Sequence, residues 1–432
     1  MEWYELTLVV FGTLLAFLAI GVPVAFAMGM AASLCATIFL GPHLLLQIGR
    51  IGFDVATNHL FLVAPLFVMM AALVSHSDIA EKAFVAATKW FNWVPGALPV
   101  STVAASTAFA AISGSSPATA AAIGYMAVPE MIRHGYSKRL AVGVVAAGGT
   151  LGILIPPSVV MVIYGIMTET SIGSLFIAGI IPGLLLTACF MGWIYLSNVR
   201  SASRVREVPV PMAEKLRTLS YMVPPFVVFG IVMGSLYFGI ATATESAALG
   251  VIVALFFVWQ MGKLNWEVLR TCFIATARVS GMILLIIMAA FILNLTISLT
   301  GVADAMTRWV TGLGLSATGL ILALVVFYLV LGMFMDVLSM QVATIPITFP
   351  IATAIGVDPI WFGIFIVLMC EMGMITPPVG MNLFVVHGIR PDKGGIEDAI
   401  WGALPYAVIM ILFTLLMMAW PSMVTWLPGK MA

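Results

Sequence analysis

Charged residues are scarce in this chain, and their scarcity excludes most classes of soluble protein. Only 8% of the 432 residues are Asp, Glu, Lys or Arg, and 62% are hydrophobic, whereas an ordinary soluble domain carries about 25% charged residues. The formal net charge is +0 and the basic residues are scattered, so nothing favours binding to nucleic acid. A chain this apolar requires the lipid bilayer as its solvent.

Cysteine is also rare, with four residues that each lie alone in an apolar stretch, at positions 35, 189, 272 and 370. No CxxC or Cys/His spacing accompanies them, so the sequence predicts neither disulfides nor a metal cluster. A cleavable signal peptide is not evident either, because the first five residues include two acidic side chains and no basic one. We therefore expect the first apolar run to remain as a spanning helix.

Long apolar runs are abundant, and runs of about 20 residues predict membrane-spanning helices. Two further apolar stretches, 96–132 and 315–355, are interrupted by polar segments, which we name the first tip (Ser113–Pro117) and the second tip (Asp336–Gln341). Each stretch is either two full spans joined by a turn or one re-entrant helical hairpin, because its halves are only about 17 residues long. The ten predicted spans lie near residues 5–21, 22–40, 53–75, 140–165, 172–198, 220–237, 239–260, 274–300, 358–385 and 396–425.

The two halves of the chain align with one another at a shift of 221 residues. This shift sets Pro156-Pro157 on Pro377-Pro378, each preceded by Gly-x-x-x, and it sets the first tip on the second. Five crossings per half make the second half start from the opposite side, so the repeats are inverted, which places a binding site near the midplane between them. We expect an all-α polytopic membrane protein with inverted repeats over 1–200 and 218–432, a polar linker over 201–217, and one hairpin and one broken helix (140–165 and 358–385) per repeat.

Basic residues indicate the orientation, because they collect on the cytoplasmic side of membrane proteins. If each hairpin enters and leaves on one face, fifteen of the eighteen Lys and Arg residues share one side, which places both termini in the periplasm. Full spans in place of hairpins would leave this count unchanged. The fifteen are Lys82, Lys89, Arg133, Lys138, Arg139, Arg200, Arg204, Arg206, Lys215, Arg217, Lys263, Arg270, Arg278, Arg390 and Lys393, and the other three are Arg50, Arg308 and Lys430.

The two proline pairs interrupt helices, and we name the segments around them the first break (Gly152–Ser158) and the second break (Gly373–Pro378). Proline has no amide hydrogen, so it releases carbonyl oxygens, which inside a membrane need another helix, water or a cation. Sodium favours such neutral oxygen ligands. Each break is either part of a sodium site or a packing kink, and the tip hydroxyls either bind ions or permit close helix packing. Their repeated register favours sites.

The tips and breaks together supply the predicted site residues. Both tips begin a helix, whose N-terminus attracts an anionic group, so we expect the substrate carboxylate between them. The first predicted sodium site consists of Ser113, Gly114, Ser115, Ser116, Pro117, Thr150, Gly152, Pro156 and Ser158, the second of Asp336, Ser339, Gln341, Glu371, Gly373, Thr376 and Pro377, and the substrate site of Ser116, Thr119, Ser339 and Asn382.

Asp336 and Glu371 are the carboxylates expected deep in the membrane, where a charge costs roughly 2.5–3.5 kcal/mol or more and marks a functional candidate. Asp336 is the stronger candidate because it lies at a tip. Glu371 either acts in the site or accepts hydrogen bonds at the end of a broken helix. Glu245 is expected to cap a helix as a structural residue.

Several motifs in combination closely resemble the large membrane subunit of tripartite ATP-independent periplasmic (TRAP) transporters, a DctM-like permease, over essentially the whole chain. One departure is Thr242-Ala-Thr-Glu245, where the family pattern has Thr-Pro-Thr-Glu, which leaves the helix start less rigid. The motifs are Ser113-Gly-Ser-Ser-Pro-Ala-Thr-Ala-Ala-Ala-Ile-Gly124, Gly148-Gly-Thr-Leu-Gly-Ile-Leu-Ile-Pro-Pro-Ser158, Thr242-Ala-Thr-Glu-Ser-Ala-Ala-Leu-Gly250, Leu331-Gly-Met-Phe-Met-Asp336 and Gly373-Met-Ile-Thr-Pro-Pro-Val-Gly380.

The resemblance implies a subunit of the bacterial inner membrane that pairs with a small four-helix membrane subunit and receives an organic anion from a periplasmic binding protein. It further implies that Na⁺ gradients drive uptake and that hairpins and broken helices slide together against a scaffold like an elevator. Two rivals remain: a self-sufficient sodium or proton symporter of related fold, and an intramembrane enzyme. Against the enzyme, the sequence has no HExxH motif and no Gly-x-Gly-Asp aspartyl pair.

Overall fold

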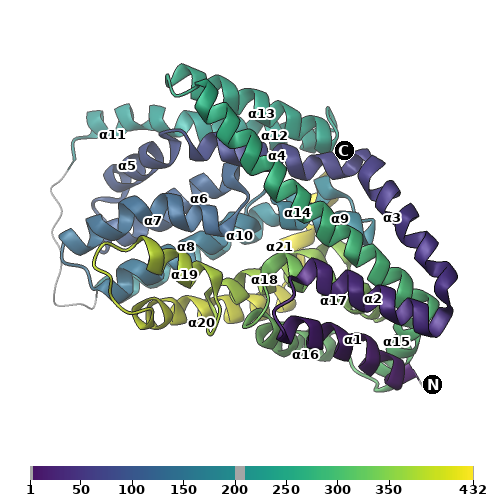
Figure 1. Cartoon of the computed structure of the whole chain (residues 1–432). Helices are drawn as coiled ribbons and strands as arrows, with labels where there is room; N and C mark the ends of the chain where they lie inside the picture. Colours follow the sequence, from purple (N-terminus) through teal and green to yellow (C-terminus); the bar gives the residue numbers. More distant parts are fainter. Residues whose placement is uncertain (1–2, 200–209, 432) are drawn as a thin grey trace.

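The computed structural model describes residues 3–199 and 210–431, and within these residues it contains helices and no strand (Figure 1). The all-α prediction is therefore confirmed. The first half comprises α1 (Trp3–Ala19), α2 (Val24–Leu40), α3 (Leu45–Thr57), α4 (Val63–Ser75), α5 (Ile79–Phe91), α6 (Ala97–Ser113), α7 (Ser116–Arg133), α8 (Lys138–Leu154), α9 (Val159–Thr168) and α10 (Ile172–Val199). The second comprises α11 (Met212–Thr218), α12 (Val223–Tyr237), α13 (Ala243–Gln260), α14 (Trp266–Leu299), α15 (Val302–Gly312), α16 (Ala317–Gly332), α17 (Val337–Ala354), α18 (Pro359–Ile375), α19 (Met381–Ile389), α20 (Glu397–Ala419) and the short α21 (Ser422–Thr425).

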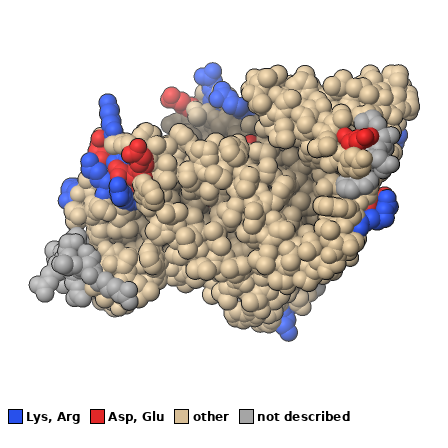
Figure 2. All heavy atoms as spheres, turned by 90° about the horizontal axis from the view of Figure 1, so that it is seen from below, with Lys and Arg blue, Asp and Glu red and all other residues tan. Residues whose placement is uncertain are grey.

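The surface and the helix lengths are those of a multi-pass membrane protein. Among the described residues, six helices are long and apolar enough to cross a membrane, or up to eight if each of two bent pairs forms one span. Shorter apolar helices, including α1 and α2, accompany them. Figure 2 shows charged side chains gathered toward the ends and edges of one face, with almost none across its centre. Such an uncharged band suits contact with lipid hydrocarbon.

The two halves have the same order of elements. In each half a short helix (α5 or α15) precedes a helical hairpin (α6–α7 or α16–α17), then an interrupted helix (α8–α9 or α18–α19), then a long helix (α10 or α20). Contacts between the halves occur in matching pairs, since α9 packs on α17 and α19 on α7, while α4 packs on α13 and α14 on α2. Each half thus completes the packing of the other.

The core lies where the two interrupted helices meet. Every residue of α8 from Ala141 to Leu154 is buried, and so is every residue of α18 from Trp361 to Ile375. These two helices contact each other, and α14 runs diagonally across the molecule, packing against α2 and α4 (Figure 1). The first break and the α18 side of the second break are therefore buried, whereas Pro378 and Val379 are exposed.

The helix boundaries differ from the predicted spans in one region of each half. The span expected at 53–75 is divided into α3 and α4, which are bent by 54°, because Asn58 ends α3 and its side chain accepts the amide of Leu60. The span expected at 274–300 begins eight residues earlier, at Trp266, because Asn265 caps the helix there. Arg200, Arg204, Arg206 and most of the predicted linker 201–217 lie outside the described residues.

Candidate functional site

A cavity of about 390 Å³ lies where the two tips face the rest of the protein. The first tip borders it through residues 113–117, and the second tip through Asp336, Val337 and Leu338. The facing wall is formed by α4 and α14, and Ile153 and Met374 of the two interrupted helices also border the cavity. Both tips and both interrupted helices thus meet at one partly open cavity.

The first tip owes its shape to its glycine and proline. Gly114 ends α6 with a φ of +58°, in the left-handed region that glycine adopts without steric penalty. Ser115 is extended and Pro117 stands in the first turn of α7, where a missing amide hydrogen breaks no helical bond. No side chain caps the α7 N-terminus, and the first-turn residues Ser116, Pro117 and Ala118 border the cavity, so this helix end carries no fixed anion.

The first tip packs on the first break through two close backbone contacts. A Cβ atom placed on Gly114 would lie 2.6 Å from the carbonyl oxygen of Pro157. One placed on Gly152 would lie 2.6 Å from the carbonyl oxygen of Ser115. Since real Cβ atoms do not approach so closely, both positions require glycine for this packing.

Oxygen atoms gather where the first tip meets the first break. The Oγ of Ser113 lies 2.6 Å from the Oγ1 of Thr119, which donates to the Ser115 carbonyl at 2.9 Å. The Oγ of Ser158 is buried and has no hydrogen-bond partner among the described residues. Thr150 differs, because its hydroxyl donates to Ala147 within its own helix at 2.7 Å. The cluster offers neutral hydroxyl and carbonyl oxygens, which suit a hard monovalent cation.

The second tip is built differently, because Asp336 caps its helix. The Oδ2 of Asp336 accepts the amides of Leu338 at 3.1 Å and Ser339 at 3.3 Å, and its Oδ1 accepts the hydroxyl of Ser339. The N-terminus of α17 therefore already holds a carboxylate. The expectation that both tips offer a free helix N-terminus to an anion is wrong for the second tip.

The second break also packs on its own tip. The amide of Val379 donates to the carbonyl of Met333 at 3.2 Å, and a Cβ on Gly373 would lie 2.9 Å from the Cα of Gly332. Thr376 donates its hydroxyl to Met372 at 2.6 Å, and Pro377-Pro378 is cis, as is Pro156-Pro157. Close glycine packing between α16 and α18 thus fixes the second tip against the second break.

Three buried polar side chains of the second half reach into the first half. Glu371 accepts the amide of Ile153 on Oε1 at 3.2 Å, and its Oε2 is buried without a partner in the described part of the chain. Gln341 donates to the carbonyl of Val160 at 2.9 Å. The sequence assigned both residues to the second sodium site, whereas the structure places both against the region of the first break.

Asn382, at the start of α19, also joins the two halves. Its Nδ2 donates to the Oγ of Ser116 and to the carbonyl of Ala146, each at 3.1 Å, and Ser116 donates to Gly149 at 2.7 Å. Among the four predicted substrate residues, Ser116 borders the cavity. Thr119, Ser339 and Asn382 do not. The polar groups of Thr119 and Asn382 are engaged between helices, and the hydroxyl of Ser339 donates to Asp336 at the start of its own helix.

The sequence did not predict the residues of the opposite wall of the cavity. This wall consists of apolar side chains such as Val68 of α4 and Val279 and Met282 of α14. These residues carry no polar motif and resemble any other apolar position of a membrane helix, so no pattern distinguished them. Only the packing of α4 and α14 opposite the tips brings them to the cavity.

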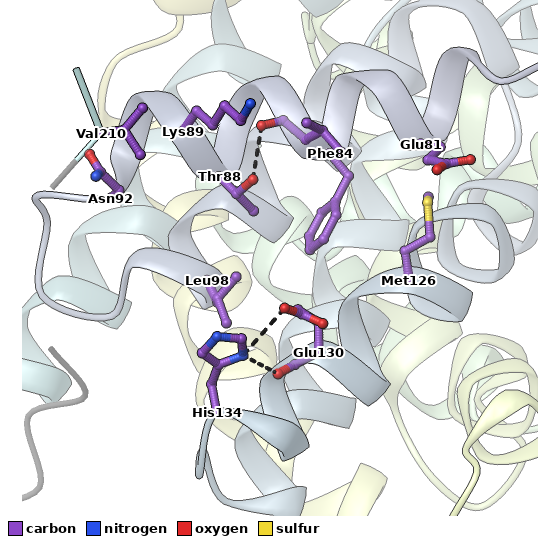
Figure 3. Close-up of a pocket in the computed structure, with 11 residues that line it drawn as sticks. Glu81, Phe84, Thr88, Lys89, Asn92, Leu98, Met126, Glu130, His134 and Val210 are labelled. Atoms are coloured by element: carbon purple, nitrogen blue, oxygen red, sulfur yellow. Dashed lines mark hydrogen bonds and ion pairs between the residues drawn. The ribbon is translucent and has the colours of Figure 1, made fainter. Parts of the chain in front are cut away.

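A second hollow of about 530 Å³ lies between α5 and α7 (Figure 3). Three of its titratable side chains, Lys89, Glu130 and His134, pair with one another or with neighbours. Glu130 lies 2.7 Å from Arg133 and 3.4 Å from His134, and Lys89 lies 2.6 Å from Glu214. Paired charges leave little to recognise a charged ligand, so the cavity between the tips is the better candidate.

Among the described residues, no group of three or more His, Cys, Asp or Glu side chains is placed to hold a metal ion.

Comparison with known proteins finds matches over most of the chain. The family model "Tripartite ATP-independent periplasmic transporter, DctM component" matches residues 11–423. The chain is 33% identical to the C4-dicarboxylate TRAP transporter large permease protein DctM of Vibrio cholerae, over 95% of this chain and 94% of that protein. It is 32% identical to the isethionate TRAP transporter permease protein DctMQ of Oleidesulfovibrio alaskensis, over 94% of this chain and 64% of that protein.

A solved structure shares the fold. The YdaH transporter of Alcanivorax borkumensis superposes with a TM-score of 0.62 at 15% identity, covering 89% of each chain. At this identity the likeness concerns the fold alone, and it is the fold of a transporter. The expectation of a transporter fold is confirmed.

Replacing Gly152 by alanine should loosen the contact between the first tip and the first break. The new methyl group would meet the Ser115 carbonyl at 2.6 Å and the Thr119 hydroxyl at 2.8 Å, and such overpacking costs about 1–3 kcal/mol. Gly281→Ala is the matched control, because no atom lies within 4 Å of its added Cβ. Thermal unfolding of the purified protein should show a lower midpoint for Gly152→Ala alone. Equal midpoints would contradict the packing.

Replacing Glu371 should show whether its carboxylate supports the first break. Glu371→Leu leaves the buried amide of Ile153 without its acceptor, a loss of about 1–3 kcal/mol. Glu371→Gln keeps an oxygen acceptor of the same reach and should unfold at a temperature closer to wild type. If the two variants unfold at the same temperature, the hydrogen bond has no measurable role.

Proposed function

The chain belongs to the DctM family, the large permease component of TRAP transporters, and we propose that it imports an organic acid anion driven by a sodium gradient. It is a transport subunit rather than an enzyme, as its relatives are permeases. The relatives' printed names specify C4-dicarboxylates and isethionate, all organic anions. We assign the anionic substrate to the cavity between the two tips.

The charge of the cavity carries this proposal. Among its described lining residues there is no Lys or Arg, and the one charged side chain is Asp336. An organic anion entering this space meets a carboxylate of the same sign and no basic side chain, which is unfavourable at low dielectric constant. A cation that binds together with the anion removes that penalty. These electrostatics favour coupling to a cation, and we propose that this cation is sodium.

The two tips have different proposed roles in binding the substrate and sodium. The uncapped N-terminus of α7 at the first tip offers amides to the substrate carboxylate. The oxygen cluster of Ser113, Thr119, Ser115 and Ser158 provides the first sodium site. Asp336 at the second tip is the ligand we assign to a second sodium, since its carboxylate borders the cavity.

The proposed movement during transport takes place at the boundary between the two tips and the wall formed by α4 and α14. The tips pack tightly on the two breaks, whereas the wall formed by α4 and α14 faces them across the cavity. We propose that tips and interrupted helices slide as one body past α4 and α14, carrying the substrate across the membrane. Both termini are placed on the periplasmic side, from the distribution of basic residues.

The proposed partners are a small membrane permease subunit and a periplasmic binding protein. The chain spans 64% of the relative named DctMQ, which supports a second permease component in the complex. Selection among organic anions would then depend on the binding protein, because the cavity offers few specific polar groups.

Uptake by proteoliposomes tests the proposed assembly. The large subunit, its small-subunit partner and the substrate-loaded binding protein should together take up substrate when sodium is higher outside, and uptake should cease without the gradient. Omission of the binding protein should abolish uptake. Equal sodium-driven uptake by the large subunit alone would instead identify a self-sufficient symporter, and uptake that follows only a proton gradient would contradict sodium coupling.

Neutralising Asp336 tests its role as a cation ligand. Asp336→Asn keeps a side-chain oxygen to accept the amides of Leu338 and Ser339 but removes the charge. The sodium concentration that gives half-maximal uptake should therefore rise at least about tenfold. Asp304→Asn is the matched control, since Asp304 lies on an exposed position of α15. An unchanged sodium dependence of Asp336→Asn would remove this residue from the coupling site.

A further inference from the structure

A cluster of five charged residues joins three helices near the N-terminal end of α8, whereas the first break lies at the C-terminal end of α8. Its centre is Arg390, which directly follows α19. The side chain of Arg390 is 0% exposed. The other members are Lys138 and Arg139 at the start of α8, Asp392 in the loop, and Asp398 at the start of α20. We name these five residues the Arg390 cluster.

The geometry of the Arg390 cluster is specific. The guanidinium donates to both oxygens of Asp392, at 2.6 Å and 2.8 Å, to Asp398 at 3.1 Å and to the carbonyl of Gly395 at 2.8 Å. Lys138 lies 2.8 Å from Asp392, and Arg139 lies 3.4 Å from Asp398. Each carboxylate therefore bridges the buried arginine and a basic residue of α8.

The Asp392 carboxylate of this cluster keeps its charge at physiological pH. Hydrogen bonds from Arg390, with a further contribution from Lys138, hold the pKa of Asp392 well below its usual range. A carboxylate with a lowered pKa contributes stability above its ordinary pKa and loses it only as the pH falls toward the lowered value. Lys138 and Arg139 are largely solvent-exposed and contribute little individually, so Arg390 and its carboxylates are decisive.

Backbone packing reinforces the same junction. Gly143 of α8 lies directly against the backbone of Gly402 of α20, and Gly402 lies against the carbonyl of Arg139. Added Cβ atoms would overlap these groups, so α8 and α20 touch main chain to main chain. Gly394 similarly makes room for the Arg390 guanidinium.

The helix α19 is consequently attached to α8 at both of its ends. Asn382 bonds to Ala146 and Ser116 at its start, and the Arg390 cluster joins its end to the start of α8. The nine residues of α19 span about 14 Å. Two attachments this far apart prevent both sliding and rotation of α19 along α8.

We propose that the Arg390 cluster fixes α8, α19 and α20 as one rigid unit, so that the interrupted helices of the two halves move together during transport. This inference rests on the sliding motion in the proposed function. Arg390, Asp392 and Asp398 are positioning residues, since no contact brings them to the cavity. During transport they keep the distance and orientation between the first and second breaks constant.

Cross-linking across the cluster tests this proposal. Cys189 is exposed and is first replaced by serine, and Lys138→Cys and Asp392→Cys are then combined. Without cross-linking, this double variant should lose uptake and unfold at a temperature lower by about 5 °C or more. A short bifunctional thiol reagent should restore both uptake and the unfolding temperature. Restored unfolding temperature with abolished uptake would overturn the proposal, because it would mean that α8 moves relative to α20 in the cycle.

A control pair separates this inference from the proposed function. Val279→Cys of α14 and Val337→Cys of the second tip lie on facing sides of the cavity, and linking them should abolish uptake. If linking this pair leaves uptake intact, the sliding motion is wrong. If the reconstituted wild-type complex shows no uptake, the proposed function fails. The Arg390 cluster is then tested by the unfolding temperature alone. If the cross-link between positions 138 and 392 does not restore the unfolding temperature, the rigid unit is wrong.

Discussion

Backbone groups released by two consecutive prolines at the centre of a membrane protein must find partners within the protein or in a ligand, because lipid supplies none. At the first break, other segments of the chain lie against the interrupted backbone. The first tip packs on it at Gly114 and Gly152, and Glu371 of the other half accepts the amide of Ile153. These contacts bring the first tip, the second half and the oxygen cluster to one place.

The same need explains why the proposed substrate site and the proposed ion sites share one location. Interrupted helices expose polar backbone only where another polar group, water or an ion can meet it. The cavity contains one carboxylate and no basic side chain among its described lining residues, so an anion gains little from this site alone. In the proposed function, a cation held by the nearby oxygens supplies the missing charge and makes joint binding of the two solutes favourable.

Local rules made much of the fold predictable from the sequence. Apolar length predicted a helical membrane protein, and the proline pairs and polar tips marked the interrupted helices and hairpins, because these features depend on a few neighbouring residues. Contacts between the halves were not predictable. Alignment of a repeat pairs equivalent positions, whereas Gln341 with Val160 and Asn382 with Ser116 are contacts between non-equivalent ones. Nor did the sequence reveal that Asp336 occupies the N-terminus of its own helix.

Binding of radioactive sodium to the purified subunit tests the central claim most directly, because it requires neither partner nor substrate. The account predicts saturable sodium binding that is weakened when Ser113 and Ser158, two hydroxyls of the oxygen cluster, are both replaced by alanine, and strengthened when an organic anion is added. Absence of saturable binding, or binding that is unchanged by both the substitutions and the anion, would contradict it.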